Sequence, residues 1–309
     1  MKYATIEPST DKAVLKERQV PADATKVLAV SVNPIDIVVA GGEFPLRSFN
    51  PGDTLGYGGV AEKADGTRVY FYDPEPPAGS LAEQIDLSTA RTIDLPDGTD
   101  PKIAAYLGVP GMAAYAGTVQ AGGVKEGETV LVTGAAGSVG MIAAQVAMSE
   151  GAKVVGLVRP DNAEDFGAVE KAGMTGLKNV EDDDELAEAL KEAAPDGVDL
   201  VIDTLWGELP ERFIPLLNHR ARWVEIGSGA GAEARIAAPV FRNKLISILG
   251  HTNFLLTEEE ARKAYEGVVK LAGEGKVTAT FETVTFDQLP ETWDALAAKE
   301  LSGKYVVEF

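Results

Sequence analysis

The chain has 309 residues, 45% of them hydrophobic and 25% charged, so it is long enough for two domains with a substantial core. It contains no cysteine, which excludes disulfides, thiolate metal sites and a cysteine nucleophile. Its 48 acidic residues against 28 basic ones give a net charge of −20, which disfavours nucleic acid and acidic membranes as partners.

The N-terminal residues lack an apolar segment of signal-peptide length, and no apolar run elsewhere approaches the length of a membrane span. We therefore expect a soluble, cytoplasmic protein.

Residues 1–110 have the pattern of a β-rich region with many turns. Short β-prone runs, such as 26–30 and 68–72, are separated by clusters of Gly, Pro and Asp, such as 50–53 and 74–79. No helix-length amphipathic pattern precedes residue 100. This architecture differs from that expected for the middle of the chain.

A strand, a glycine turn and a helix are predicted in succession from residue 129 to residue 150. Gly134 permits the tight turn, Gly137 lets a pyrophosphate approach the backbone, and Gly140 lets the helix pack closely on the strand. The helix N-terminus offers N–H groups and the positive end of a dipole to phosphates. Turns of this kind also occur where nothing binds, but the next strand at 153–158 favours a dinucleotide site. Its candidate residues are Gly134, Ala136, Gly137, Ser138, Val139 and Gly140.

Strands and helices alternate between residues 111 and 252, which predicts an α/β fold with a doubly wound parallel sheet. Ligands of such sheets sit beyond the carboxyl ends of the strands. The segments after the strands ending at 133, 158, 203 and 226 are therefore the expected pocket floor. Strands are predicted at 129–133, 153–158, near 176, 199–203, 222–226 and 245–250, and helices at 183–193 and 209–217.

The C-terminal part begins with a capping-box pattern, Thr257 followed by Glu260, which predicts a helix start. A strand at 278–286, a helix at 290–299 and a final strand at 305–309 are expected to follow. Strands placed this way are able to return to the sheet of the first domain.

Four stretches of the sequence carry a resemblance to a known family, and together they span almost the whole chain. They are 32–36 (VNPID), 107–115 (LGVPGMAAY), 127–140 (GETVLVTGAAGSVG) and 303–307 (GKYVV). On these residues the chain resembles the medium-chain dehydrogenase/reductase superfamily, most closely its zinc-free, zeta-crystallin-like quinone oxidoreductase branch. Double-bond reductases of the alkenal and prostaglandin type share the second stretch, so the resemblance leaves the substrate class open.

The resemblance implies a GroES-like β-rich substrate domain at 1–110, completed by 253–309, and a Rossmann domain at 111–252. It also implies a homodimer formed through the strand at 245–250. Zinc-dependent relatives bind the metal through cysteine and histidine, whereas this chain has only His219 and His251. The family's Gly-His-Glu stretch corresponds to Gly56-Tyr57-Gly58, so no metal is expected.

The resemblance implies NADPH as the cofactor. The residues at the end of the strand at 153–158 help to decide between NADPH and NADH. An acid there would bond the ribose hydroxyls of NAD, but this chain has Val158 followed by Arg159, whose guanidinium is suited to a 2′-phosphate. The alternative is a solvent-facing Arg159 paired with Asp161 or Glu164. The family's tyrosine at this site falls on Val180.

On the substrate side, Asn33 and Asp36 match the family's motif close to the nicotinamide, although Asn-Pro and Asp are also frequent turn formers. The family's pocket tyrosines fall on Val38 and Phe44, which lack hydroxyls. Tyr57 or solvent is then the candidate proton donor, although chance packing of Tyr57 is an equal alternative.

Further cofactor candidates follow later strands. Gly227, Ser228 and Gly229 are expected to form a backbone platform on the nicotinamide side, and Asn253 is a candidate by position. His251 follows the last strand of the sheet and has a pocket role or a structural role with equal weight, whereas His219 is expected at the surface.

Two functions remain open. The first is a zinc-independent oxidoreductase that uses NADPH to transfer hydride to a small-molecule substrate, either a quinone or an activated double bond. The second is an NADPH-binding protein of the same fold with little or no turnover.

Overall fold

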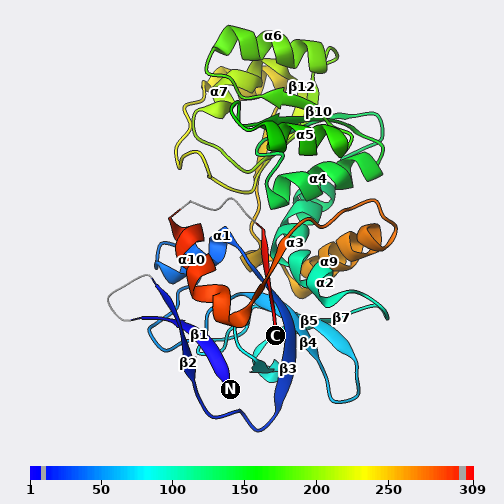
Figure 1. Ribbon diagram of the computed structural model, residues 1–309. Helices are drawn as coiled ribbons and strands as arrows, with labels where there is room; N and C mark the ends of the chain where they lie inside the picture. Colours follow the sequence, from blue (N-terminus) through cyan, green and yellow to red (C-terminus); the bar gives the residue numbers. More distant parts are fainter. Residues whose placement is uncertain (8–11, 299–303) are drawn as a thin grey trace. The chain divides into compact units, whose positions relative to one another are not determined.

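The computed structural model describes residues 1–7, 12–298 and 304–309, and the chain divides into two compact units. The first unit comprises Met1–Val109 and Ala279–Phe309, and the second comprises Pro110–Thr278. Figure 1 colours the elements of both units in chain order, from blue to red. The chain thus leaves the first unit near residue 110 and returns to it near residue 279.

The second unit is built on a six-stranded sheet of order β10-β9-β8-β11-β12-β13, and each neighbouring pair is parallel. The strand order reverses between β8 and β11, which is where such sheets bind ligands. The predicted doubly wound parallel sheet is therefore confirmed. The strands are β8 (Thr129–Val132), β9 (Lys153–Val158), β10 (Thr175–Lys178), β11 (Val198–Asp203), β12 (Leu217–Glu225) and β13 (Ser247–Gly250).

Helices connect these strands, and the central strands are buried almost along their whole length, as expected when both faces of a parallel sheet are covered. Aromatic packing supports one face, where the fully buried Trp223 meets Phe213 edge-on at 5.1 Å between ring centroids. The helices are α3 (Val109–Tyr115), a π-helix (Ala116–Ala121), α4 (Ser138–Ser149), α5 (Ala163–Lys171), α6 (Asp183–Ala193), α7 (Leu209–Phe213), α8 (Ala238–Lys244) and α9 (Glu258–Gly273).

Two element boundaries in this unit differ from expectation. The predicted helix at 209–217 is α7 followed by a 3-10 helix, Ile214–Leu216, because Pro215 has no N–H to continue the α-helix. Strand β12 begins at Leu217 rather than at 222, so the exposed His219 lies within a strand. Residues 218–220, just after the buried Leu217, are polar and partly or fully exposed, so no apolar run marks the start of this strand.

The segment 253–278, expected in the first domain, groups with the second unit. Helix α9 buries Tyr265 and Val268, and the ring of Tyr115 leaves no room for a Cβ at Gly267. Gln145 of α4 exchanges two hydrogen bonds with Thr278, each of 2.8 Å. The apolar face of α9 therefore finds its partner in the second unit, a choice that periodicity alone does not reveal.

The first unit contains a seven-stranded sheet along which β14, β15, β3, β4, β5 and β7 are neighbours, with β6 paired to β3. A separate antiparallel pair is formed by β1 and β2. The strands are β1 (Lys2–Ile6), β2 (Ala13–Glu17), β3 (Ala24–Val32), β4 (Gly58–Glu62), β5 (Arg68–Tyr72), β6 (Gln84–Asp86), β7 (Arg91–Asp94), β14 (Glu282–Thr285) and β15 (Tyr305–Glu308).

Three short helices accompany this sheet: α1 (Pro34–Ala40), α2 (Pro101–Tyr106) and α10 (Leu289–Ala297). Helix α1 is too short to give the amphipathic repeat that sequence reasoning searches for. The C-terminal strand predicted at 278–286 spans only Glu282–Thr285, and residue 299, the predicted end of the last helix, lies outside the described residues. The predicted return of the last strand is confirmed, because β15 pairs with β3.

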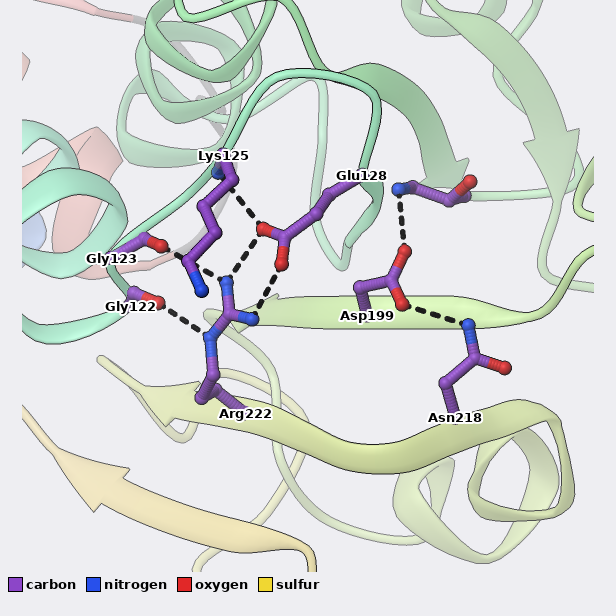
Figure 2. A network of polar contacts seen from close by, with 8 residues as sticks. Gly122, Gly123, Lys125, Glu128, Asp199, Asn218 and Arg222 are labelled. Atoms are coloured by element: carbon purple, nitrogen blue, oxygen red, sulfur yellow. Dashed lines mark hydrogen bonds and ion pairs between the residues drawn. The ribbon is translucent and has the colours of Figure 1, made fainter.

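A network of hydrogen bonds and an ion pair lies at the amino end of β8 in the second unit (Figure 2). The guanidinium of Arg222 on β12 binds both carboxylate oxygens of Glu128 at 2.7 and 2.6 Å, and its Nε donates to the carbonyl of Gly122 at 2.7 Å. Burial raises the pKa of Glu128, but the bonds from Arg222 and the Lys125 N–H outweigh it, and the net pKa is lowered. The polar groups at this end of the sheet bind one another.

Candidate active site

The glycine turn joins β8 to α4 at the carboxyl end of the sheet. Helix α4 starts at Ser138, and Gly137 at its N-cap provides no side-chain hydrogen bond to the first turn. The backbone N–H groups of the first turn are thus uncapped by any side chain, at the positive end of a 12-residue helix. This arrangement fits the pyrophosphate of a dinucleotide.

Close packing explains why glycine occupies these positions. A Cβ on Gly140 would lie 2.3 Å from the carbonyl oxygen of Gly134, and Gly134 itself has φ +60. A Cβ on Gly137 would meet only the Gly134 oxygen, at 3.1 Å, with nothing else within 4 Å. The turn is therefore compact on its inner side and open over Gly137, as the sequence predicts for a phosphate-binding turn.

Arg159 follows β9 as predicted, but its charge already has a partner. Its Nη2 lies 3.1 Å from the carboxylate of Asp165 in the first turn of α5, and its side chain is 61% exposed. The partner expected in the alternative interpretation was Asp161 or Glu164, so the type of pairing was foreseen but the residue was not. A guanidinium is thus present beyond β9, partly neutralised by Asp165.

A second arginine near the end of the sheet was missed by sequence reasoning. Arg212 on α7 donates to the Asn179 side chain at 2.9 Å and to the Val180 carbonyl, immediately after β10. It also lines a cavity of about 1490 Å³ whose wall carries five carboxylates, those of Glu181, Asp184, Glu208, Glu211 and Glu233. No local pattern marks Arg212, because its partners lie more than 30 residues earlier in the chain.

The predicted platform, Gly227–Ser228–Gly229, follows β12 and is bonded to the loop after β11. The Gly229 N–H donates to the Thr204 carbonyl at 3.3 Å, and the Ala230 N–H donates to the Leu205 carbonyl at 2.7 Å. A Cβ on Gly227 would lie 3.1 Å from the Thr204 carbonyl oxygen. The Thr204 hydroxyl also donates to the carbonyl of Thr133, next to Gly134, at 2.9 Å. Thr204, which was not predicted as a site residue, therefore contacts both the glycine turn and the platform.

His251 and Asn253 contact each other. The Nε2 of His251 lies 3.1 Å from the Asn253 side-chain oxygen, and the His251 N–H donates to the Glu225 carbonyl at 2.8 Å. Burial lowers the pKa of His251, and the bond to Asn253 only partly opposes that shift. The imidazole is thus neutral at pH 7.

On the first unit, Asn33 and Asp36 satisfy each other as the capping box of α1. The Asn33 N–H donates to the Asp36 carboxylate at 2.8 Å, and the Asn33 side-chain amide reaches the same oxygen at 3.3 Å and the Ser31 carbonyl at 3.1 Å. The helix-forming role of this motif is therefore realised in the structure.

Asp36 is only 2% exposed, and burial raises its pKa to about 6 against the opposing effects of the Asn33 hydrogen bonds, the Arg47 charge and the Tyr57 N–H. Tyr57 is 4% exposed, and burial raises its pKa far above the usual value, so its phenol keeps its proton at all physiological pH values. The structure thus brings the three predicted substrate-side residues together.

Arg47 joins this cluster and was not predicted. Its side chain is 8% exposed, its Nη1 lies 2.6 Å from the Asp73 carboxylate, and its guanidinium carbon lies 5.7 Å from the centroid of the Tyr57 ring. Asp73 has φ +52, an uncommon conformation for a residue other than glycine. Nothing in the loop sequence around Arg47 distinguishes it from a surface arginine.

Within the described ranges, no group of three or more His, Cys, Asp or Glu side chains is arranged to hold a metal ion. In the same ranges, none of the helices combines the length and apolar character needed to cross a membrane.

Fold and glycine turn together define a two-unit α/β protein with a dinucleotide-type turn, and comparisons with known proteins identify the family. Residues 138–270 match the family model described as "Zinc-binding dehydrogenase". The "Putative NADP-dependent oxidoreductase YfmJ" of Bacillus subtilis is 32% identical over 72% of this chain and 68% of its own length. "Prostaglandin reductase 1" of Bos taurus is 33% identical over 65% of this chain and 63% of its own length.

Solved structures agree on the fold. The Escherichia coli quinone oxidoreductase in complex with NADPH aligns over 100% of both chains with a TM-score of 0.82 and 22% identity. The quinone oxidoreductase of Thermus thermophilus aligns over 100% of both chains with a TM-score of 0.82 and 24% identity. The chain belongs to the medium-chain dehydrogenase/reductase superfamily, which confirms the resemblance recognised in its sequence.

Proposed function

We propose that this protein is an NADPH-dependent, zinc-independent oxidoreductase that transfers hydride to a quinone or to a double bond conjugated to a carbonyl. The observation that carries the proposal is the glycine turn with its uncapped helix start. The names of the relatives, an NADP-dependent oxidoreductase and a prostaglandin reductase, support the same reaction class.

When bound, the nicotinamide supplies the hydride, and the chain's own residues supply binding and polarisation. The turn from Gly134 to Gly140 receives the pyrophosphate, and the platform from Gly227 to Gly229 supports the nicotinamide side, with His251 and Asn253 as further contacts. Arg159 is assigned to the 2′-phosphate, where its planar guanidinium suits a phosphate.

Asn33, Asp36 and Tyr57 are assigned to the acceptor side. Because the pKa of Tyr57 is raised, its phenol is a hydrogen-bond donor rather than a base, which suits the polarisation of a carbonyl oxygen. Asp36, whose pKa is about 6, changes charge within the range in which many enzymes work, so it is a candidate for a pH-dependent step.

A second candidate function is an NADPH-binding protein with little turnover. It is favoured by the substrate side, where Asn33 and Asp36 already bind each other and where Val38 and Phe44 stand without hydroxyls. Both candidates share the cofactor and differ only in turnover, so one experiment separates them.

The proposal includes a homodimer and a cytoplasmic location. Strand β13 is an edge of the six-stranded sheet and exposes Ile248 (38%), with Leu245 (47%) just before it. An exposed apolar edge strand is a template for pairing with a second copy. The lack of cysteine suits a reducing compartment.

The experiment is a calorimetric titration of the protein with NADPH and NADH, followed by NADPH oxidation assays with a panel of quinones and enones. Tighter binding of NADPH and turnover with either acceptor class support the oxidoreductase. Binding without turnover across the panel supports the second candidate, and a lack of binding to either nucleotide at millimolar concentration contradicts both.

A further inference from the structure

Asp203, the last residue of β11, is a fully buried carboxylate at the carboxyl end of the sheet. Its Oδ1 accepts the hydroxyl of Thr133 at 2.6 Å and the N–H groups of Leu205 and Trp206 at 3.0 Å each. Its Oδ2 accepts the indole N–H of Trp223 at 3.1 Å. All four donors are uncharged, so hydrogen bonds alone compensate the burial of this group.

These donors come from three segments that flank the reversal of strand order. Thr133 immediately precedes Gly134 of the glycine turn, and Leu205 and Trp206 form the loop after β11. Trp223 lies on β12, which leads into the platform at Gly227. One carboxylate therefore ties together the three segments on which the proposed dinucleotide site is built.

Thr204 contacts the same segments as Asp203 does, through its backbone and its hydroxyl. Its N–H donates to the Thr133 hydroxyl and its own hydroxyl donates to the Thr133 carbonyl, both at 2.9 Å. Its Oγ1 lies only 2.5 Å from the place that a Cβ on Gly134 would take, and its carbonyl accepts the N–H of Gly229 at 3.3 Å. Thr204 therefore spans the gap between the glycine turn and the platform.

Trp206 adopts a left-handed conformation with φ +53, which is unfavourable for a bulky residue. The bond from its N–H to Asp203 and the contact of its ring with Trp223, 5.1 Å between centroids, hold it there. It also forms an isolated β-bridge with Gly231, beyond the platform. Strain of this kind persists where the surroundings impose it, often beside a functional site.

We infer that Asp203, acting through Thr133, Thr204 and Trp223, is a positioning residue that sets the spacing between the glycine turn and the nicotinamide platform. The inference rests on the proposed function, since it concerns how the same dinucleotide site is held in shape. Asp203 itself is covered by its four donors and acts on the ligand only through the segments it fixes.

Asp199, at the other end of β11, provides a matched control. Its carboxylate also accepts two neutral donors, the Thr129 N–H at 3.0 Å and the Asn218 amide at 2.8 Å, but at the amino end of the sheet (Figure 2). Asp199→Asn and Asp203→Asn thus make the same chemical change on one strand. The first lies away from the proposed site, and the second lies beside it.

The experiment measures the Kd of NADPH and of 2′-phospho-ADP-ribose, which lacks the nicotinamide, for wild type and the variants. Asp203→Asn is expected to raise the Kd for NADPH at least tenfold, and Asp199→Asn less than twofold. Thr133→Val, which removes one hydroxyl and keeps the shape, is expected to raise the Kd for both ligands about fivefold. Trp223→Phe is expected to raise the Kd for NADPH about threefold and to leave that of the fragment unchanged.

Equal effects of Asp203→Asn and Asp199→Asn on the Kd would overturn the inference, and so would wild-type affinity in both Asp203→Asn and Thr133→Val. If Asp203→Asn does not fold, Thr133→Val and Trp223→Phe decide alone. An unchanged Kd for both ligands in Thr133→Val, or an equal loss for both ligands in Trp223→Phe, then overturns the inference. If wild type binds neither ligand, the proposed function itself fails.

Discussion

Helices α4 and α1 each follow a strand, one in each unit, but the polar groups at their first turns are arranged differently. In α4 the N-cap is Gly137 and no side chain bonds to the first turn. In α1 the N-cap is Asn33, and the Asp36 carboxylate of the first turn accepts the Asn33 N–H at 2.8 Å. A helix start without a side-chain cap leaves donors for a ligand, whereas a capped start uses its polar groups to stabilise itself.

The backbone N–H groups at the start of α4 are therefore available to a ligand, whereas the polar side chains at the start of α1 already form hydrogen bonds within the protein. The motif that includes Asn33 and Asp36 resembles a functional motif of the family, but its polar atoms bind one another first. The glycine turn has no side chains to occupy it. Its candidate function rests on backbone groups, and the packing of Gly134, Gly137 and Gly140 explains their identity.

The largest effect is expected when a carboxylate is placed at the helix start of α4. Gly137→Asp places a carboxylate at an N-cap whose φ of −67 suits any residue, so the helix gains stability, by about 0.5 kcal/mol. The same carboxylate repels a pyrophosphate, and we expect the Kd for NADPH to rise about a thousandfold, or about 4 kcal/mol. Calorimetric titration and thermal unfolding measure the two effects.

Gly137→Ala is the control for this substitution, since it adds the same Cβ without the charge. That Cβ would lie 3.1 Å from the Gly134 oxygen, so a loss of severalfold in affinity is expected. Similar losses for the Ala and Asp variants would show that space, not charge, governs binding at this helix start.

The next largest effect is expected at Asp36, in the way the free energy of unfolding depends on pH. The pKa of Asp36 is raised to about 6 in the folded protein, mainly by burial, so the folded state holds this proton more tightly than the unfolded state. The resulting stabilisation is complete below about pH 4 and is lost as the pH rises through 6, roughly 3 kcal/mol in total. Asp36→Asn should remove that loss.

Urea unfolding of wild type and Asp36→Asn at pH 4, 5, 6 and 7 checks this expectation. The free energy of unfolding of the variant should exceed that of wild type increasingly across this range. Parallel profiles would mean that Asp36 has an ordinary pKa in the folded protein.

A smaller effect is expected from Arg47→Met, which keeps much of the side-chain volume and removes the charge. Asp73 loses its 2.6 Å partner but is 30% exposed and regains water, so we expect a loss of about 2 kcal/mol in the free energy of unfolding. The pKa of Asp36 should also rise further, because the Arg47 charge lowers it. Chemical denaturation at two pH values measures both changes.

Lys63→Met is the matched control, since the Lys63 side chain is 39% exposed and pairs with an exposed Asp94. It should change stability by less than about 0.5 kcal/mol. A loss as large as that of Arg47→Met would argue against a special role for the buried arginine.

The smallest effect is expected at the edge of the proposed cofactor site. Arg159 is largely exposed and already paired with Asp165, so Arg159→Ala should reduce the preference for NADPH over NADH only about fivefold, near 1 kcal/mol. Asp165→Asn should increase that preference by freeing the guanidinium. If Arg159→Ala leaves the ratio of the two Kd values unchanged, the 2′-phosphate role belongs to another group.

Local features of the sequence predicted much of the fold. The β-branched run before Gly134, the glycine spacing and the alternation of strands and helices predicted a doubly wound sheet, which is confirmed. The start of β12 was not predicted, because residues 218–220 are polar. Helix α9 was expected in the first domain but groups with the second unit, since its apolar face does not reveal its partner.

In the candidate site, too, local features were predicted from the sequence and long-range contacts were not. The glycine spacing alone predicts where a turn and a helix start lie, because backbone sterics act between residues that are close along the chain. Folding brings Arg47 to Asp73, buries Asp36 and raises its pKa, and places Asp203 against Thr133, 70 residues away in the chain. Charge pairing, desolvation and hydrogen bonding depend on neighbours in space, and the chain alone does not specify them until it is folded.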